Sequence, residues 1–520
     1  MAVRGLVKQG EYFDSITLMR AGKALAQTAG VQDAAVVMGT AENRAILQAA
    51  SLLCPELEGA SEADLLIAVM AETDALAEQG LARAMDVLAE LKKRTSSNTA
   101  FRPRSLQGAL EGLPDARLAL ISVAGRYAGE LARKALENNL HVMLFSDNVD
   151  LETEIQLKQD GAKRGLLVMG PDCGTAIING VPLGFANAVP RGDIGIVAAA
   201  GTGLQEVTCL IAHEGGGVSQ AIGTGGRDLK VEVGGIMFLE AIKALQADPE
   251  TRLLLLVSKP PHPAVLDRIA TTIKGSGKPV VACFLGAKPD AMAGTGALMT
   301  TTLEEAALLC VALSRSGFAD PARSAKEVKA RLEARDAGLA PAARLEAARV
   351  APGRKVLRGL FSGGTFCYEA QLLLGQALGT VHSNAPAFGS LQLKSALHSE
   401  GHTVVDLGED EFTVGRPHPM IDFDLRNRRI VEEAKDPATA VLLLDVVLGF
   451  GANLDPAAEL VPVLQGLQGI SVIASITGTD QDPQNRLKVE AALKDAGVTV
   501  MPSNAAACSL ALQTLRALNG

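Results

Sequence analysis

Short apolar runs alternate with longer amphipathic stretches along most of this chain. Between residues 115 and 185 the apolar runs have the length of strands, and the stretches between them have helical spacing. The predicted order is strand, helix, strand, helix, strand, at 118–123, 127–138, 140–145, 151–160 and 165–169. Strands that are joined through helices pair in parallel, with right-handed crossover connections. This pattern therefore predicts an α/β protein.

Two longer series of the same kind follow, and a shorter one precedes. Residues 191–313 contain predicted strands at 194–199, 218–223, 253–258 and 279–285. Residues 354–518 contain predicted strands at 356–361, 403–406, 440–447, 470–475 and 498–501. Near the amino terminus, strands at 34–38 and 65–70 alternate with helices near 14–29, 41–52 and 73–94. Residues 314–353 are rich in Ala, Arg, Lys and Glu without a strand pattern, which indicates a connector. The predicted domains are therefore 1–100, 110–188, 189–314, a connector at 315–353, and 354–520.

Composition narrows the class of protein. Hydrophobic residues make up 48% of the chain, yet only 3% are aromatic and there is no Trp, so the cores are built from small aliphatic residues. The net charge of −9 argues against a nucleic-acid surface. The seven cysteines are scattered without a CxxC pair, which is typical of a reducing compartment and predicts no metal site. No apolar run is long enough to cross a membrane, so we expect a cytoplasmic protein with no membrane segment.

Two glycine-threonine turns carry the clearest chemical signal. Ala200-Gly201-Thr202-Gly203 follows the predicted strand at 194–199, and Ser362-Gly363-Gly364-Thr365 follows the one at 356–361. A strand, a glycine turn and a helix start together form a general cradle for phosphate, because the backbone approaches the anion and helix N–H groups point at it. Two such turns in separate domains predict one shared anionic ligand. The alternative is that the glycines only permit tight turns.

Further motifs give the chain a family resemblance. Gly170-Pro171-Asp172-Cys173 stands where the succinyl-CoA synthetases have Gly-Pro-Asn-Cys, and the segment from Gly195 to Thr202 resembles their phosphate turn, with Glu206 also kept. Residues 115–313 resemble the α subunit, residues 354–510 resemble the carboxyl-terminal domain of the β subunit, and the FdrA branch is the nearer match. The resemblance implies a Rossmann-like CoA-binding-type domain, two flavodoxin-like ligase domains and a small amino-terminal α/β domain.

Two departures from that family concern its chemistry. The synthetases carry a phosphorylated histidine in a Met-Gly-His-Ala-Gly-Ala loop, whereas this chain has Met292-Ala293-Gly294-Thr295-Gly296-Ala297. Gly294 offers no nucleophile, so a phosphohistidine relay cannot pass through it. The supporting glutamate of the family is replaced by Lys259. These changes predict that the synthetase reaction itself is lost.

The FdrA resemblance implies a different reaction. Such proteins are associated with allantoin breakdown, as a component of an oxamate carbamoyltransferase that interconverts oxalurate plus phosphate with oxamate plus carbamoyl phosphate. We therefore expect a carbamoyltransferase subunit that works with companion subunits in an oligomer. Two alternatives remain open, an acyl-CoA synthetase and a non-catalytic scaffold subunit.

Candidate site residues follow from these arguments. Carbamoyl transfer needs a held phosphate and a polarised acyl oxygen. We expect phosphate to bind at the two turns, with Lys259, Thr202 and Thr365 in catalytic roles. The residues expected to hold phosphate are Gly201, Thr202, Gly203, Ser362, Gly363, Gly364 and Thr365. The alternative for Lys259 is a solvated loop lysine, and the alternative for His262 as a proton donor is a structural role.

Polar loops after later strands offer candidates for substrate binding. Asn453 and Thr479 are predicted to bind an amide or carboxylate, and Arg416 to clamp a carboxylate. Each of these has a surface-loop alternative, and the acidic run 409–411 is too unspecific to predict a metal site. The loop at 124–127 lacks a G-x-G-x-x-G motif, so CoA binding is not predicted from the residues.

Overall fold

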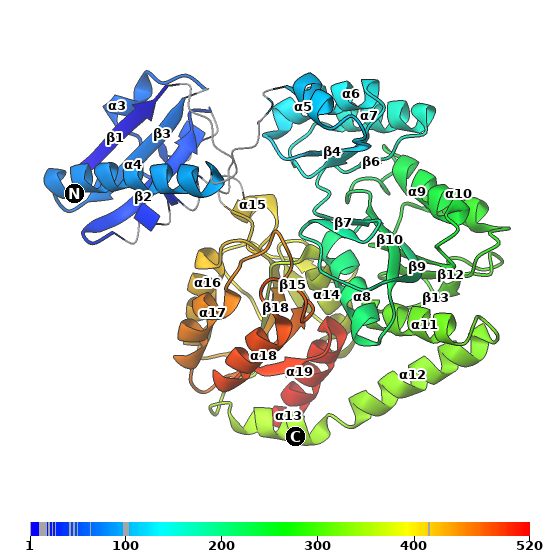
Figure 1. Cartoon of the computed structure of the whole chain (residues 1–520). Coiled ribbons are helices and arrows are strands. Elements are labelled where there is room, and N and C mark those ends of the chain that lie inside the picture. Colours follow the sequence, from blue (N-terminus) through cyan, green and yellow to red (C-terminus); the bar gives the residue numbers. More distant parts are fainter. Residues whose placement is uncertain are drawn as a thin grey trace. The chain divides into compact units, whose positions relative to one another are not determined.

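Four sheets and the helices around them make up the protein, which we describe from a computed structural model (Figure 1). The structure describes residues 2–9, 18, 21–22, 24–25, 28–40, 43–44, 47–48, 50–62, 64–96, 103, 105–413 and 417–519. The chain divides into two compact units. The first comprises Met1–Gly112 and Phe412–Pro417, and the second comprises Leu113–Glu411 and His418–Gly520.

The first unit contains an antiparallel three-stranded sheet in the order β1-β3-β2. The central strand β3 is almost wholly buried, because helix α4 covers one face and residues 47–60 cover the other. The sequence pattern predicted β2 and β3 but missed β1, whose residues are all half-buried and lack a clear alternation. The elements are β1 (Ala2–Lys8), β2 (Val31–Met38), α3 (Pro55–Glu58), β3 (Leu65–Ala71), α4 (Asp74–Ser96) and α5 (Leu106–Gly112).

The second unit opens with a small parallel sheet in the order β4-β5-β6. This is the predicted strand–helix–strand series, and α7 extends four residues beyond its predicted end, up to the left-handed Gly165. A short hairpin follows that the pattern missed because each arm has only four residues, and it joins the next sheet. The elements are β4 (Leu118–Ile121), α6 (Gly125–Glu137), β5 (His141–Leu144), α7 (Leu151–Arg164), β6 (Val168–Met169), β7 (Thr175–Ile178) and β8 (Val181–Gly184).

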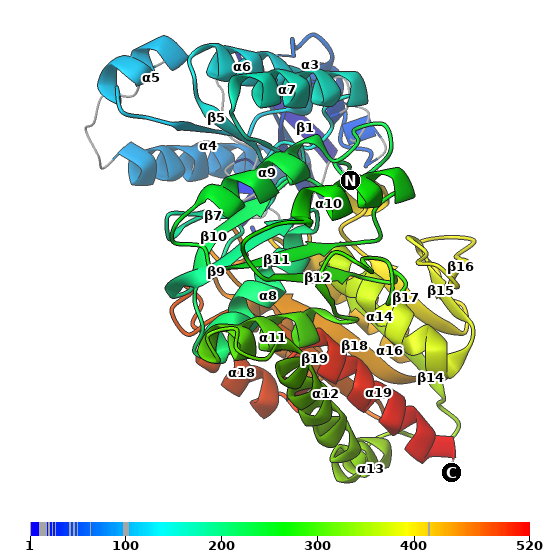
Figure 2. The same ribbon diagram turned by 90° about the vertical axis from the view of Figure 1, so that its right-hand side faces the viewer.

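The first large sheet has seven strands in the order β13-β12-β11-β9-β10-β7-β8. Its central strands are parallel and apolar on both sides, because α8 and α11 cover one face and α9 and α10 cover the other (Figure 2). The elements are β9 (Arg191–Ala198), α8 (Gly201–His213), β10 (Val218–Gly223), α9 (Ile236–Ala247), β11 (Leu253–Ser258), α10 (Pro263–Ile273), β12 (Val280–Phe284), β13 (Leu298–Met299) and α11 (Leu303–Arg315).

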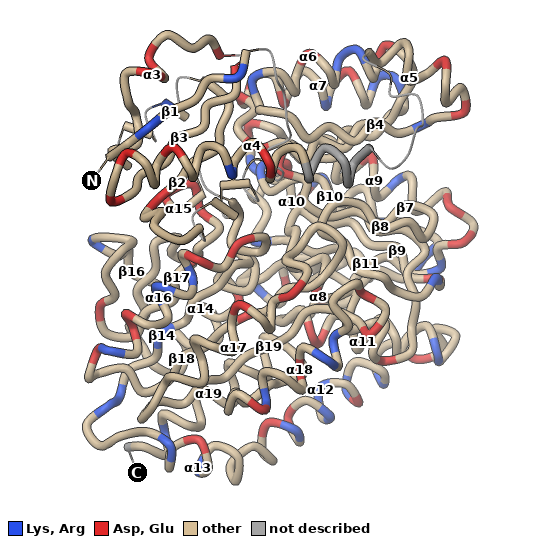
Figure 3. The backbone as a smooth tube through the Cα atoms, turned by 60° about the vertical axis from the view of Figure 1, so that its left-hand side comes forward, with Lys and Arg blue, Asp and Glu red and all other residues tan. Residues whose placement is uncertain are grey.

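Two helices form the connector between the large sheets. They are α12 (Pro321–Ala337) and α13 (Ala340–Ala348). Basic and acidic residues alternate along α12, as is typical of a solvated helix (Figure 3). In α13, by contrast, Glu346 is buried and accepts hydrogen bonds from the hydroxyl groups of Ser471 and Thr499. The connector is therefore attached to the second large sheet.

The second large sheet is parallel, with seven strands in the order β16-β15-β17-β14-β18-β19-β20. Helices α14 and α19 cover one face, and α16 packs on β14 and β18. The elements are β14 (Val356–Phe361), α14 (Gly364–Leu378), β15 (Val381–Ser383), β16 (Leu391–Gln392), β17 (His402–Asp406), α15 (Asp410–Thr413), α16 (Asp424–Lys435), β18 (Thr439–Val447), α17 (Pro456–Gln465), β19 (Ser471–Thr477), α18 (Arg486–Asp495), β20 (Thr499–Met501) and α19 (Asn504–Asn519).

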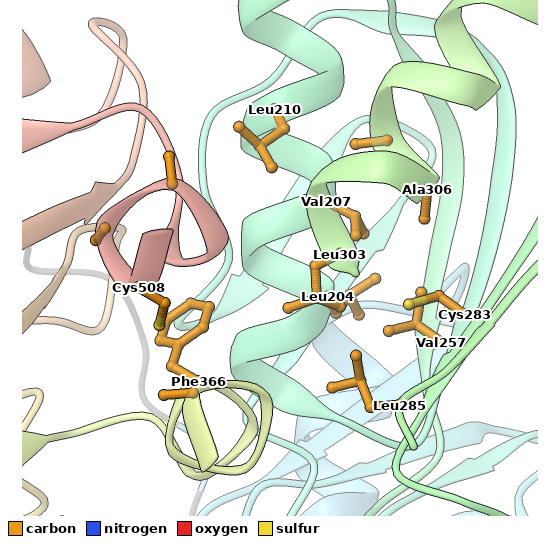
Figure 4. Packing of buried hydrophobic residues seen from close by; sticks show 14 of the residues in the cluster. Leu204, Val207, Leu210, Val257, Cys283, Leu285, Leu303, Ala306, Phe366 and Cys508 are labelled. Carbon is orange, nitrogen blue, oxygen red and sulfur yellow. The ribbon is translucent and has the colours of Figure 1, made fainter. Parts of the chain in front are cut away.

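One hydrophobic core spans both large sheets. Leu204 and Val207 of α8 and Leu303 of α11 belong to the same buried cluster as Phe366 of α14 and Cys508 of α19 (Figure 4). Helix α8 contacts α14, and α11 contacts α19. The two large sheets are therefore joined through a shared helical layer, which brings the starts of α8 and α14 together. Among the described residues, no helix is long and apolar enough to span a membrane.

Candidate functional site

The first glycine-threonine turn leads from β9 into α8. Ala200 is extended and provides no capping side chain, and its carbonyl oxygen accepts the first helical bond from Leu204 at 2.9 Å. The N–H groups of Gly201, Thr202 and Gly203 precede that bond and have no partner within the helix. Since the first turn of α8 contains no acidic residue, the positive end of its dipole is uncompensated by its own sequence.

The second turn leads from β14 into α14 and is already partly occupied. The carboxylate of Asp445 accepts hydrogen bonds from the backbone N–H groups of Ser362 and Gly363, each at 2.9 Å, and from the Ser362 hydroxyl at 3.0 Å. Asp445 is buried and paired with the buried Arg426 at 3.2 Å. The donors of Ser362 and Gly363 are therefore committed to Asp445, and anion binding at this turn depends on Gly364 and Thr365.

The two turns lie against one another, as the sequence predicts. A Cβ placed on Gly203 would come within 2.9 Å of the Thr365 methyl group, and one on Gly363 within 2.8 Å of the Thr202 hydroxyl oxygen. These glycines permit the close approach of two helix starts. Thr202 and Thr365 are 9% and 4% exposed, and their hydroxyls have no hydrogen-bond partner among the described residues. Two positive helix ends and two unpaired hydroxyls thus converge.

Lys259 adds a cation near the start of α14. It follows β11, where open α/β sheets bind ligands, and its ammonium group lies 5.3 Å from the centre of the Tyr368 ring. No carboxylate is paired with it among the described residues. His262, in contrast, caps α10 by accepting a hydrogen bond from the Ala264 N–H at 3.3 Å, which is a structural role.

Sequence reasoning missed Asp406, which ends β17. This carboxyl group is buried, and its Oδ2 lies 2.6 Å from the position of a Cβ on Gly364. Burial raises its pKa to about 7, with further increases from Glu409 and Asp445 and an opposing effect of Lys259. The available signal was an acidic residue at the end of an apolar strand.

The other predicted substrate-binding residues have structural partners. Asn453 donates to the carbonyl oxygen of Ile421 at 3.1 Å and to the carboxylate of Glu459 at 3.0 Å. The Thr479 hydroxyl donates to the carbonyl oxygen of Ala188 at 2.7 Å. None of these hydrogen bonds links Asn453 or Thr479 to the two turns. Substrate binding by these residues therefore stays a prediction. Arg416 lies outside the described residues.

Two buried glutamates form a reciprocal pair, of which the sequence analysis noted Glu206 in the family resemblance and missed Glu369. Glu206 of α8 accepts from the Asn504 N–H at the start of α19, and Glu369 of α14 accepts from the Leu303 N–H at the start of α11. Burial raises the pKa of each carboxyl group to about 7. Each glutamate therefore satisfies a helix start that belongs to the opposite sheet, which makes the pair an element of the shared helical layer.

The loop around Gly294 has room for a side chain but carries none. Gly294 has a left-handed backbone, with φ 77°, and no atom lies within 4 Å of a Cβ built on it. The loop therefore lacks a nucleophile because its residue is glycine, and not because the space is filled by other atoms. No phosphohistidine can form at this position.

The turn before α6 packs closely on the loop that follows β5. A Cβ on Gly125 would lie 2.2 Å from the carbonyl oxygen of Asp147 and 2.4 Å from that of Asn148. Glycine at this position therefore permits the close approach of two backbone segments.

Comparison with known families identifies two matching segments. Residues 360–514 match the CoA-ligase family, and residues 1–103 match a family described as AllF, heavy metal-associated domain. The first match covers most of the second large sheet and includes the turn at Gly364. The second covers the antiparallel sheet of the first unit.

Individual relatives fall into two groups. The uncharacterized protein YahF of Escherichia coli (strain K12) is 41% identical over 512 residues, which is 97% of both chains. The ADP-forming sulfoacetate-CoA ligase subunit SqwL of an Acholeplasma species is 28% identical over 32% of this chain and 59% of its own. A succinate–CoA ligase α subunit of Staphylococcus epidermidis is 23% identical over 33% of this chain and 56% of its own. The matches to the ligase subunits thus span little more than half of those proteins.

The name of the amino-terminal family raises the question of a metal. Residues 1–103 contain one cysteine, Cys54, and no histidine. Burial raises the pKa of the Cys54 thiol to about 11, so it is a poor source of thiolate. Zinc is held by several thiolate, imidazole or carboxylate ligands. Among the described residues no group of three or more His, Cys, Asp or Glu lies together, so this segment does not fit a zinc site, and no step of the chemistry below depends on a metal.

Proposed function

The chain belongs to the family that includes YahF of Escherichia coli, and we propose that it is a component of a carbamoyltransferase that converts oxalurate and phosphate into oxamate and carbamoyl phosphate. The observation that carries this proposal is the contact between the starts of α8 and α14, where the Thr202 and Thr365 hydroxyls have no hydrogen-bond partner among the described residues, in a chain whose Gly294 supplies no nucleophile for a phosphoenzyme. Such a site favours a phosphate or acyl phosphate held by the protein without a covalent phosphoenzyme.

The reaction needs only positioning and charge stabilisation. An oxygen of phosphate attacks the carbamoyl carbon of oxalurate, the bond from that carbon to the oxalyl amide nitrogen breaks, and the nitrogen takes the proton that phosphate brought. Backbone N–H groups at Gly201, Gly203 and Gly364, with the hydroxyls of Thr202 and Thr365, would hold the phosphate oxygens. Lys259 would neutralise charge that develops on them. Removing one such donor costs about 2.7–4 kcal/mol in comparable oxyanion sites.

The amino-terminal match supports the metabolic setting. Residues 1–103 resemble the AllF domain, which is consistent with a role in allantoin breakdown. We propose that the carboxylate end of oxalurate is bound by Arg416, Asn453 or Thr479 or by companion subunits of the same complex. The small unit formed by these amino-terminal residues would then bind those subunits.

Phosphate-dependent cleavage of oxalurate tests the proposal. The full chain, combined with its companion subunits, should release oxamate from oxalurate only when phosphate is present. Thr202→Ala should lower kcat/KM by about 10²-fold. Thr271→Ala is the matched control, because that hydroxyl is exposed on α10 and donates to the carbonyl oxygen of Asp267. Absence of phosphate-dependent cleavage in the complete complex would exclude the carbamoyltransferase.

An acid–thiol ligase is the second candidate. It is favoured by the CoA-ligase match over residues 360–514 and by the ligase subunits among the relatives. Gly294, which offers no nucleophile where the ligases carry their histidine, argues against it. A ligase would bind CoA and show CoA-dependent nucleotide turnover, so CoA titration of the full chain by calorimetry separates the two candidates.

A further inference from the structure

Asp406 brings an unpartnered oxygen to the anion site. The residue is 2% exposed, and its Oδ1 accepts a hydrogen bond from the Gly408 N–H at 2.9 Å. Its Oδ2, which lies at the Gly364 backbone, has no hydrogen-bond partner among the described residues. A buried carboxyl oxygen is therefore aimed at the start of α14, where the anion is expected.

The charged groups around Asp406 come from several elements. Lys259 follows β11, Asp445 lies on β18 and is paired with Arg426, and Glu409 precedes α15. A Cβ on Gly408 would lie 3.0 Å from Nε2 of His418, and burial lowers the pKa of that histidine to about 4, so its ring is neutral at neutral pH. Among these groups, Lys259 is the one cation without a carboxylate partner in the described part of the chain.

An ionised Asp406 and a phosphate dianion at the same helix start would repel one another. A protonated Asp406 would instead donate a hydrogen bond to the anion. Because burial raises its pKa to about 7, both forms exist near neutral pH. The proposed reaction also requires a proton to pass from phosphate to the departing amide nitrogen, and a group that titrates near the working pH suits that role.

We propose that Asp406 carries this proton. As a carboxylic acid it donates a hydrogen bond to the bound anion and protonates the departing amide nitrogen, and as a carboxylate it accepts the proton of phosphate. The transfer step rests on the proposed function, whereas the coupling between anion binding and protonation rests on the position of the buried Asp406 at the start of α14.

Proton uptake on anion binding tests the coupling directly. Sulfate is a suitable probe because it remains a dianion through the neutral range, so any proton taken up belongs to the protein. Titration calorimetry of the full chain in buffers of different ionisation enthalpy should show uptake of close to one proton per sulfate at about pH 8. Affinity for sulfate should also fall about tenfold per pH unit above the pKa of Asp406.

Asp406→Asn separates the possible outcomes. The amide can donate the same hydrogen bond, so this variant should still bind sulfate, without proton uptake and without the loss of affinity at high pH. Glu369→Gln is the matched control: its carboxyl group is buried on α14 with a pKa similarly raised, but it bonds Leu303 away from the turn. That variant should keep the proton uptake.

The results also distinguish failure of this proposal from failure of the proposed function. Sulfate binding without proton uptake, or uptake that persists in Asp406→Asn, would refute the role of Asp406 and leave the anion site intact. No sulfate binding at all would refute the anion site and Asp406 with it. In the complete transferase, Asp406→Asn should lower kcat by about 10²–10⁴-fold and flatten its pH profile.

Discussion

Glu369 accepts a hydrogen bond from the backbone N–H of Leu303 at 2.8 Å and thereby ties the start of α11 to the helix layer of the second large sheet. Its other oxygen accepts from the side-chain amide of Asn504 at 2.8 Å. Glu206, on α8 of the first large sheet, in turn accepts a hydrogen bond from the Asn504 N–H at the start of α19, which belongs to the second large sheet. Because the two glutamates belong to the helices that begin at the glycine-threonine turns, they help to hold those turns together.

Stability should therefore depend on pH in part through these two carboxyl groups. Burial raises the pKa of each from 4.5 to about 7, so the folded protein holds protons that the unfolded chain releases. The free energy of unfolding should fall as pH rises from 4.5 through about 7. In Glu206→Gln the fall should become smaller but not vanish, because Glu369, Asp406 and Asp172 also have raised pKa values in this range, as measured by urea unfolding across it. The exposed Glu333→Gln serves as the control, and an unchanged slope in Glu206→Gln would contradict the account.

Glycine should be required where the two turns touch. Gly203→Ala would place a methyl group 2.9 Å from the Thr365 side chain and should lower the free energy of unfolding by about 1–3 kcal/mol. Gly201→Ala is the matched control on the same turn, since no atom lies within 4 Å of its new methyl group. Thermal melting of the two variants checks the prediction, and equal melting temperatures would show that the turns are not in contact.

The buried pair of Arg426 and Asp445 should be costly to break. Arg426→Met leaves Asp445 without its cation in a buried site and should destabilise the protein by about 3–5 kcal/mol. Arg428→Met alters an exposed arginine on the same helix and should change stability by less than about 0.5 kcal/mol. Urea unfolding at neutral pH provides the comparison. A small effect of Arg426→Met would show that Asp445 is satisfied by Ser362 and Gly363 alone.

Zinc should have no effect on the amino-terminal unit. Because residues 1–103 offer one buried cysteine and no histidine, zinc should not bind there at stoichiometric levels. A chelator should leave the thermal unfolding of the full chain unchanged. Elemental analysis of the purified protein checks this, and one equivalent of zinc that is lost in Cys54→Ser would overturn it.

Much of the architecture could be predicted from the sequence, because the buried parallel strands are continuous apolar runs flanked by helical periodicity. Leu253–Ser258 and Thr439–Val447 are examples. The two turns could be found because glycine after a buried strand permits a tight turn and a close approach of the backbone. The short strands β7 and β8 were missed, since four residues give too little periodicity to detect.

The candidate site was harder to predict for a physical reason. Pattern analysis shows that Asp406 and Asp445 interrupt or end apolar strands, but only folding reveals which backbone N–H groups they meet. Asp445 removes Ser362 and Gly363 from the available donors, and Asp406 places an acid where only donors were expected. These contacts depend on the parallel pairing of β14 with β17 and β18, which places the ends of strands far apart in sequence side by side and which no local pattern encodes.

A structure with a bound anion tests the central claim most directly. Crystals of the full chain soaked in phosphate or carbamoyl phosphate should show one anion between Gly201-Thr202-Gly203 and Gly364-Thr365, within hydrogen-bonding distance of both hydroxyls. The same soak of Thr202→Ala crystals should show weaker occupancy. Density for the anion only at another position, such as the loops near Glu409, would contradict the account.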